Sequence, residues 1–306
     1  MSVTDWQLDT KTLRTVRDFV RFGASQMANA DIYFGHGTDN AWDEAVFLTL
    51  ETLHLPYSLL DQIMEAALTE SERATLLQHF DTRIRDRVPA AYLVGKAWFA
   101  GLPFIINENV LVPRSPIAEL IEKQFSPWLL EPPQKILDLC CGSGCIGIAA
   151  ATVFPEALVD LADISPEAVD VAWQNIDLHG MDERVQAIES DLFSDLQEEV
   201  YDLILCNPPY VDAEDMATMP EEYQREPALG LESGTDGLDF TRRLLVEARD
   251  HLTDNGLLVC EVGNSCYALE EAYPEVAFTW VDFEKGGHGV FIMTATELDA
   301  LLDYDV

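Results

Sequence analysis

The residues best suited to chemistry form the tetrapeptide Asn207-Pro208-Pro209-Tyr210, which follows an apolar run ending at Cys206. Two consecutive prolines fix the backbone and remove two N–H donors, which leaves carbonyl oxygens to face a ligand. We expect the Asn207 side-chain oxygen and the Pro208 carbonyl to accept both hydrogens of a substrate NH2 group. Tyr210 offers the planar group a flat ring face. This arrangement aims the nitrogen lone pair at an electrophile, so it predicts methyl transfer from a sulfonium to an amide or amino nitrogen.

A second candidate site is the small-residue turn between an apolar strand and a helix. Small residues let the backbone approach a ligand closely, and the start of the helix offers N–H groups. Asp163 ends the next predicted strand, where a carboxylate can bind both hydroxyls of a ribose, and Asp191 follows the third strand, near an adenine edge. The turn residues predicted to bind a cofactor are Asp138, Cys140, Cys141, Gly142, Ser143 and Gly144.

The turn alone does not identify the cofactor. Gly142, Gly144 and Gly147 fit the pattern GxGxxG, and Asp163 follows Gly142 at close to the spacing of dinucleotide-binding proteins. An NAD-dependent dehydrogenase and a purely structural turn therefore remain as alternatives at this point. A hydride transfer has no use for two acceptors around an NH2 group, so the loop that begins at Asn207 favours methyl transfer.

The elements that must position these residues fall into two parts. Up to about residue 87 the pattern predicts four helices: one around residues 13–27, one around 42–53 capped by Asp39 or Asn40, one at 59–68, and one that starts near Thr69 with a capping box. Residues 98–106 and 110–112 predict two short strands joined through 107–109. Beyond residue 133, strands alternate with helices, which implies a mainly parallel sheet covered on both faces. The predicted strands are 135–141, 157–162, 185–189, 201–206, 257–262, 278–283 and 290–294, the last two as an antiparallel hairpin.

Composition sets limits on the class of protein. The 306 residues are 48% apolar and 24% charged, without a run of eighteen apolar residues or a secretory signal. The six cysteines form no zinc pattern, so we expect a reduced cytoplasmic protein without metal or membrane. A net charge of −37 repels bare nucleic acid and attracts a basic protein, although such a charge also serves solubility alone.

The motifs, in this order and spacing, resemble those of class I S-adenosylmethionine methyltransferases that modify amino groups. Within that class, residues 88–95 and the stretch from Phe104 to Arg114 are similar to protein-(glutamine-N(5)) methyltransferases. Members that modify translation release factors carry a Pro-Glu-Thr-Glu type sequence after that arginine. Residues 115–121 differ from it and, like residues 35–45, resemble the branch acting on large-subunit ribosomal protein L-three.

The resemblance implies a Rossmann-like, mainly parallel seven-stranded sheet that binds S-adenosyl-L-methionine. It implies an N-terminal helical substrate-recognition domain (1–95), a β-hairpin linker (96–114) and a methyltransferase domain (115–306). It places the glutamine amide between Asn207 and Pro208, and cofactor contacts at Asn207 and the main chain of Leu192. Cys140 stands where the release-factor enzymes have glycine. The implied partner is an unassembled, basic ribosomal protein, without direct DNA binding.

Three other functions share part of these features. The release-factor branch shares the catalytic loop, and so do nucleic-acid amino-methyltransferases, although the charge and the absence of a basic stretch disfavour the latter. A non-catalytic binding module would keep the helical part and lose the site residues.

Overall fold

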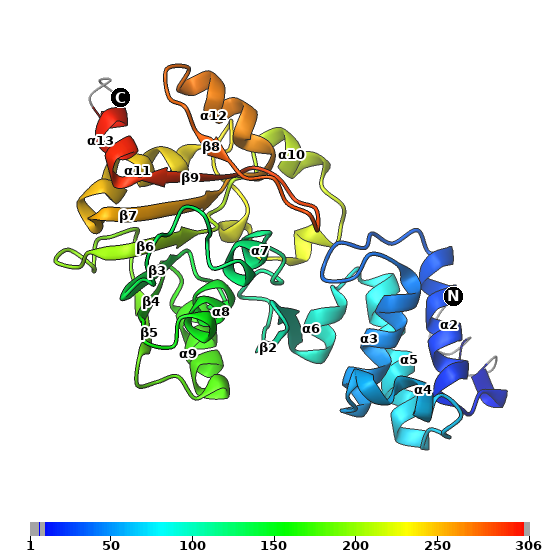
Figure 1. Cartoon of the computed structure of the whole chain (residues 1–306). Helices are drawn as coiled ribbons and strands as arrows, with labels where there is room; N and C mark the ends of the chain where they lie inside the picture. Colours follow the sequence, from blue (N-terminus) through cyan, green and yellow to red (C-terminus); the bar gives the residue numbers. More distant parts are fainter. Residues whose placement is uncertain (1–5, 7–9, 303–306) are drawn as a thin grey trace. The chain divides into compact units, whose positions relative to one another are not determined.

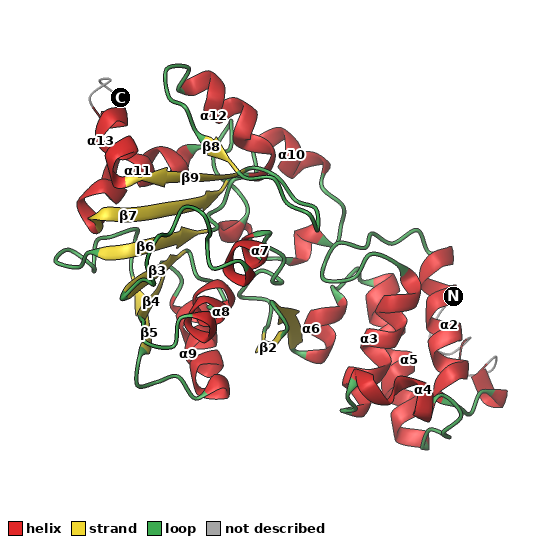
Figure 2. Cartoon of the chain, viewed as in Figure 1, coloured by secondary structure: helices red, strands yellow, loops and turns green. Residues whose placement is uncertain are grey.

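The structure of the chain is a computed structural model that describes residue 6 and residues 10–302. The chain forms two compact units, which Figure 1 shows in sequence colours and Figure 2 by secondary structure. Unit 1 comprises the residues up to Ala97 together with 106–108 and 220–225, and unit 2 comprises 98–105, 109–219 and the residues from 226 on. The predicted linker 96–114 is divided between the units: 96–97 and 106–108 group with unit 1, and 98–105 and 109–114 with unit 2. Segment 220–225, from the predicted methyltransferase domain, groups with unit 1.

Unit 1 is helical because apolar side chains recur at helical spacing and local caps define the helix ends. Thr15 and Thr69 each form a capping box with the residue three positions on, and the Asn40 side chain accepts the N–H of Asp43. Buried apolar residues from α2, α3 and α5 make the core of this unit. Its helices are α2 (Val16–Asn29), α3 (Ala41–Leu53), α4 (Leu60–Ile63), α5 (Glu70–Arg85) and α6 (Ala90–Val94).

The predicted helix at 59–68 is wrong in length. Only α4 forms there, after a single 3-10 turn at Tyr57–Leu59. The carbonyls of Met64 and Ala66 accept the N–H groups of Arg17 and Val16 at 2.9 and 3.0 Å. The segment thus ends its own helix and satisfies amides at the start of α2, which have no partner within that helix.

A buried ion cluster explains why segment 220–225 packs with unit 1. The Arg83 side chain is fully buried, and its Nε donates to Glu44 Oε1 at 2.6 Å. Its Nη1 donates to Glu222 Oε1 at 3.3 Å and its Nη2 to the Tyr33 carbonyl at 2.7 Å. A buried guanidinium requires such partners, and one of them comes from a segment more than 130 residues away.

The hairpin also differs from prediction. It consists of β1 (Lys96–Phe99) and β2 (Leu102–Ile105), and the chain turns at Ala100 and Gly101, which have φ of 47° and 78°. Two successive positive φ angles are typical of the tight turns that join antiparallel strands. Residues 110–112 are not a strand, because the Val112 N–H donates to the buried Glu226 carboxylate instead of to a neighbouring strand.

Unit 2 contains the seven-stranded sheet that the sequence predicts, so the fold class is confirmed. The strand order is β5-β4-β3-β6-β7-β9-β8; the first five are parallel neighbours, and β9 is antiparallel to both β7 and β8. The strands are β3 (Lys135–Leu139), β4 (Leu158–Asp163), β5 (Val185–Glu189), β6 (Tyr201–Cys206), β7 (Leu252–Glu261), β8 (Thr279–Trp280) and β9 (Val290–Thr294).

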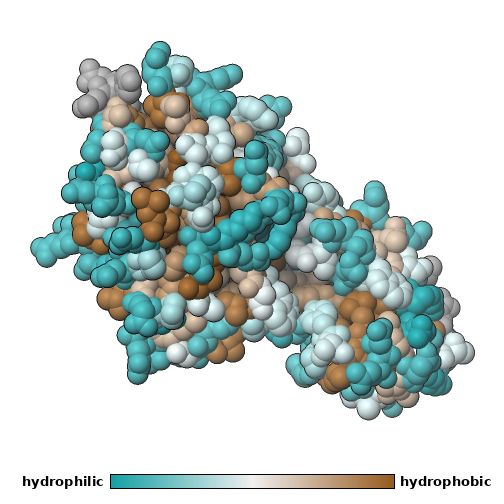
Figure 3. Space-filling model, viewed as in Figure 1, coloured by the Kyte–Doolittle hydropathy of each residue, from teal (hydrophilic) through white to brown (hydrophobic). Residues whose placement is uncertain are grey.

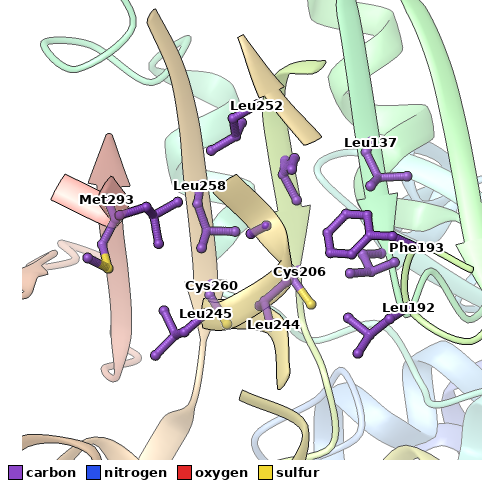
Figure 4. Packing of buried hydrophobic residues seen from close by; sticks show 14 of the residues in the cluster. Leu137, Leu192, Phe193, Cys206, Leu244, Leu245, Leu252, Leu258, Cys260 and Met293 are labelled. Atoms are coloured by element: carbon purple, nitrogen blue, oxygen red, sulfur yellow. The ribbon is translucent and has the colours of Figure 1, made fainter. Parts of the chain in front are cut away.

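Helices cover the sheet and bury its apolar side chains. The helices α8 and α9 pack on β3, β4 and β5, while α13 packs on β7 and β9. Figure 4 shows a large cluster in which side chains of β6, β7 and β9 meet those of α11, with Cys206 and Cys260 at its centre. The helices of unit 2 are α7 (Ile117–Glu122), α8 (Cys145–Val153), α9 (Pro166–His179), α10 (Ala213–Thr218), α11 (Asp239–Glu247), α12 (Cys266–Ala272) and α13 (Ala295–Leu302).

Candidate active site

A cavity of about 300 Å³ lies in unit 2 at the carboxyl ends of the parallel strands. Its wall comprises residues that follow β3, β4, β5 and β6, together with Glu261 at the end of β7. The carboxyl edge is where open α/β sheets bind their ligands. The structure brings most of the predicted site residues together there: Cys140, Cys141, Gly142, Ser143, Asp163, Asp191, Leu192, Asn207, Pro208, Pro209 and Tyr210.

The turn after β3 has an unusual backbone conformation. Cys140 has a φ of 58°, and Gly142 and Gly144 have φ of 53° and 76°. A positive φ costs a residue with a side chain of order 1 kcal/mol, and such strain gathers at functional sites. Cys140 therefore adopts a conformation natural to glycine, which keeps the turn close to the cavity although a thiol is present.

The N–H groups of this turn are already committed within the protein. Gly142 N–H donates to Asp163 Oδ2 at 2.9 Å, Gly144 N–H to the Cys141 carbonyl at 2.7 Å, and Gly147 N–H to Asp138 Oδ2 at 2.7 Å. Dinucleotide-binding turns instead offer such amides to a pyrophosphate. Here carboxylates occupy two of them, which disfavours an anionic cofactor such as NAD.

Asp138 and Gly144 do not line the cavity, unlike the other predicted turn residues. Asp138 is fully buried beneath the turn, where its Oδ2 holds the first turn of α8 through Gly147. Burial raises its pKa to about 7, and the nearby Asp163 carboxylate adds to the rise. Gly144 caps α8, and a Cβ there would lie 2.8 Å from Leu161 Cδ1. Both residues therefore shape the turn without lining the cavity.

Asp163, the last residue of β4, places its carboxylate in the cavity wall. Its two oxygens accept the N–H groups of Gly142 and Ser165, each at 2.9 Å. Burial raises its pKa, and these two N–H groups oppose the rise. Each oxygen retains a further lone pair for a ligand hydroxyl, so the geometry suits the predicted contact with a ribose.

Asp191 and Leu192 follow β5 and close another side of the cavity. Asp191 Oδ1 lies 3.0 Å from Arg243 Nη2, and both side chains are half exposed. Leu192 is buried with a φ of 53°, which is rare for a bulky residue. Strained backbone thus occurs on two sides of the same cavity, at Cys140 and at Leu192.

The loop after β6 presents acceptors to the cavity. The Asn207 side chain lines it and, among the described residues, takes part in no hydrogen bond with the protein. Pro208 is buried and Pro209 is partly exposed, and neither carries an N–H. Val211, which follows Tyr210, donates its backbone N–H to the Leu231 carbonyl, and its own carbonyl accepts the Ser233 N–H. The loop is therefore fixed at both ends, while the Asn207 amide remains available to a ligand.

Sequence reasoning missed two wall residues that hold Tyr210 and its surroundings. Glu261 accepts the Tyr210 hydroxyl at 3.0 Å and the Ser115 hydroxyl at 2.6 Å. Arg114 forms a two-pronged ion pair with Glu226, with both N–O distances 2.6 Å. A glutamate within the apolar run 257–262 indicates a buried carboxylate that needs a partner, because Glu is rarely buried without one.

The charges of the wall fit a cationic cofactor. Both arginines that line the cavity, Arg114 and Arg243, are engaged by carboxylates. Asp163 and Glu261 add two further acidic groups. A sulfonium is positively charged, and an acidic wall without an uncompensated cation suits it. The pyrophosphate of a dinucleotide has the opposite charge.

Comparison with known proteins identifies the family of this chain. The family model of the methyltransferase small domain matches residues 121–223. The ribosomal protein uL3 glutamine methyltransferase of Francisella tularensis is 47% identical over 288 residues, which cover 94% of this chain and 92% of that protein. The chain belongs to the uL3 glutamine methyltransferase family. The Bordetella pertussis protein of the same name is 43% identical over 289 residues, covering 94% of this chain and 97% of its own length.

Solved structures agree on the fold. The catalytic domain of hMettl16 in complex with MAT2A 3′UTR hairpin 6 matches with a TM-score of 0.50 at 15% identity, over 81% of this chain and 91% of that chain. At this identity the likeness shows a class I methyltransferase fold alone. As a methyltransferase of this class, the chain uses S-adenosyl-L-methionine. Over the described residues, helices are too short or too polar to span a membrane.

Proposed function

We propose that this enzyme methylates the side-chain amide nitrogen of a glutamine in ribosomal protein uL3. The observation that carries the proposal is the identity of 47% over nearly the full length of a protein named for that activity, combined with an Asn207-Pro208-Pro209-Tyr210 loop that lines the cavity. The same loop in a nucleic-acid enzyme would serve an adenine, but the charge of this chain disfavours such a substrate.

The loop suits a glutamine amide. We infer that Asn207 Oδ1 and the Pro208 carbonyl accept the two N–H hydrogens, which fixes the amide plane and leaves the nitrogen lone pair directed into the cavity. The cofactor supplies an electrophilic methyl carbon when it is bound. Catalysis rests on orientation and on hydrogen-bond acceptors, which together can lower a barrier by several kcal/mol without a covalent intermediate.

We propose the following cofactor contacts. Asp163 binds the ribose hydroxyls, because its carboxylate lines the cavity with lone pairs to spare. Asp191 and the main chain of Leu192 border the adenine. For this contact, Asp191 gives up its ion pair with Arg243. The turn from Cys140 to Ser143 supports the methionine portion. Asp138 and Gly144 act only indirectly, by shaping that turn.

We further propose that unit 1 recognises the protein substrate before its assembly into the ribosome, in the cytoplasm. This unit has an open recess whose lining includes Met27, Ile32 and Phe34 together with Asp31 and the 45% exposed Trp42. Apolar surface beside carboxylates suits a basic segment of a protein, because long cationic side chains pack their stems on apolar groups and their heads on aromatic rings.

The test offers labelled S-adenosylmethionine to purified uL3, a release factor and ribosomal RNA from the same organism. We expect label in free uL3 and on a glutamine, and less in uL3 within assembled ribosomes. Asn207→Ala should lower kcat about a hundredfold, the order seen when one oriented hydrogen-bonding group is removed. The affinity of Asn207→Ala for the cofactor should be unchanged. The control is Gln174→Ala, a substitution of an exposed residue on α9. Label confined to the release factor or to RNA contradicts the proposed substrate.

A further inference from the structure

Tyr210 is fixed within unit 2 by contacts on several sides. Its hydroxyl donates to Glu261 Oε1 at 3.0 Å, and its carbonyl accepts the Ser265 hydroxyl at 2.7 Å. Its ring lies against Gly263, where a Cβ would come within 2.6 Å of Tyr210 Cε2. A Cβ on Gly237 would come within 2.3 Å of the Tyr210 carbonyl. Two glycines therefore leave the room that this tyrosine occupies, and two polar groups hold it there.

Glu261 is an unusual residue for the end of a buried strand. Its side chain is 5% exposed, and it follows the apolar residues that pair β7 with β6 and β9. Its second oxygen, Oε2, accepts the Ser115 hydroxyl at 2.6 Å. Burial raises the pKa of this carboxyl, whereas the two hydroxyl donors and the nearby Arg114 oppose the rise. Burying a carboxylate costs free energy, so a purely structural role would be served better by an apolar side chain.

The carboxylate also joins three segments of the cavity wall. Ser115 belongs to the turn before α7, Tyr210 to the catalytic loop, and Glu261 to β7. The two hydroxyl groups approach different oxygens of one carboxylate, which fixes the orientation of that group. A rotation of Tyr210 would break this part-buried hydrogen bond and leave an oxygen of the buried Glu261 carboxyl without its donor.

We propose that Glu261 is a positioning residue for methyl transfer, which acts by holding the Tyr210 ring in one orientation beside Asn207 and Pro208. The inference rests on the proposed function, since a planar amide is the group that such a wall would align. A rigid ring restricts rotation of the amide out of the plane that its two acceptors define. Misplacement of a reacting group by about 1 Å can cost about a hundredfold in rate, so this restriction bears on kcat.

The decisive experiment compares Glu261→Ala, Glu261→Gln and Tyr210→Phe in the full chain with uL3 as substrate. Glu261→Ala and Tyr210→Phe should each lower kcat about tenfold or more, while the cofactor dissociation constant changes less than twofold. Glu261→Gln should retain most activity, because its amide oxygen still accepts the tyrosine hydroxyl. The control is Glu270→Gln, which alters another carboxylate that binds an aromatic side chain, Trp280, outside the cavity.

A double variant separates a positioning role from a structural one. If Glu261 acts through Tyr210, then Tyr210→Phe combined with Glu261→Ala should be no slower than Tyr210→Phe alone. A multiplicative loss overturns the proposal, as does full kcat in Tyr210→Phe. Crystal structures of the Glu261 variants give a readout that needs no substrate: the ring should move in Glu261→Ala and stay in Glu261→Gln. An unmoved ring in Glu261→Ala overturns the proposal, whereas failure of the wild type to methylate uL3 refutes only the proposed function.

Discussion

The substitution Asp138→Asn tests whether the buried carboxyl beneath the turn after β3 destabilises the protein at neutral pH. Asp138 is fully buried, and its Oδ2 accepts the Gly147 N–H, while its Oδ1 has no hydrogen-bond partner among the described residues. Its pKa is raised from 3.8 to about 7, chiefly by burial. Asparagine has nearly the same shape and keeps an oxygen for Gly147, but it does not ionise.

The sign follows from proton binding. Between pH 3.8 and about 7 the folded protein holds a proton on Asp138 that the unfolded chain has released, so stability falls as pH rises through this window. One pKa unit corresponds to about 1.4 kcal/mol. From pH 5 to pH 8, the wild type should therefore lose about 3 kcal/mol of unfolding free energy relative to Asp138→Asn. Other acidic groups are shared by both proteins and cancel in the difference.

The assay is urea unfolding of both proteins at several pH values, without cofactor, followed through the transition of unit 2. Burying the asparagine NH2 carries a free-energy cost that does not depend on pH. It shifts the difference in unfolding free energy between the two proteins equally at every pH, so the test uses only how that difference changes with pH. Parallel stability curves from pH 5 to pH 8 would refute the reasoning, since they would mean that Asp138 does not titrate in this window. Cofactor binding should remain measurable in the variant, because Asp138 does not line the cavity.

Three further predictions concern other parts of the chain. Replacing Arg83 by Met should lower the unfolding free energy of unit 1 by about 3–5 kcal/mol, because Glu44 and Glu222 lose the buried guanidinium that lies between them. The exposed Arg85→Met should leave the urea midpoint unchanged, and equal midpoints for the two variants would contradict the prediction. Trp42→Ala should raise the KM for uL3 at least about threefold and leave the KM for the cofactor unchanged, because the substrate loses about 1 kcal/mol of aromatic contact. The control Trp173→Ala, on α9, should leave both KM values unchanged. Cys140→Gly should keep cofactor affinity and alter unfolding free energy by less than about 1 kcal/mol, because relief of the positive φ offsets the greater freedom of the unfolded chain; a calorimetric loss of affinity would show that the thiol itself binds.

Local signals in the sequence predicted the elements that local interactions determine. The capping box at Thr69 marks the start of α5, and the amide of Asn40 caps α3, because both contacts join residues three positions apart. The strands of unit 2 were recognisable as short apolar runs, and Ser165-Pro166 marks the start of α9. The Asn207 loop was recognisable as a site because its residue types are chemically unusual together.

The features that sequence reasoning missed depend on contacts between distant segments. Glu261 and Ser115 are 146 residues apart, and their hydrogen bond is visible only in the fold. Segment 220–225 joins unit 1 through Glu222, whose partner Arg83 lies 139 residues earlier. The hairpin differs for another reason: Ala100 adopts a positive φ that its residue type does not suggest, so the pattern predicts a continuous strand where the chain turns beside Gly101.

The distribution of charge relates the fold to the proposed substrate. Residues 98–306 carry 41 of the 55 acidic residues and nine of the 18 basic ones, so most of the negative charge lies on the part that contains the cavity. Figure 3 shows hydrophilic side chains over much of the visible face of unit 2. Seven of the eight Lys and Arg side chains in this unit form ion pairs with carboxylates, and Arg184 donates to backbone carbonyls.

Under the proposed function, we expect such a surface to discriminate between free and assembled forms of a basic ribosomal protein. Its cations are engaged by carboxylates of the same chain, so few remain to neutralise the phosphates on which nucleic-acid binding depends. A free basic protein gains electrostatic attraction to the acidic unit, whereas the same protein bound to ribosomal RNA presents compensated charge and brings phosphates with it. The fold places the Asn207-Pro208-Pro209-Tyr210 loop on that acidic unit. We therefore expect methylation to precede assembly. The negative charge of unit 2 attracts the free basic protein but repels the phosphates of the ribosome that contains it.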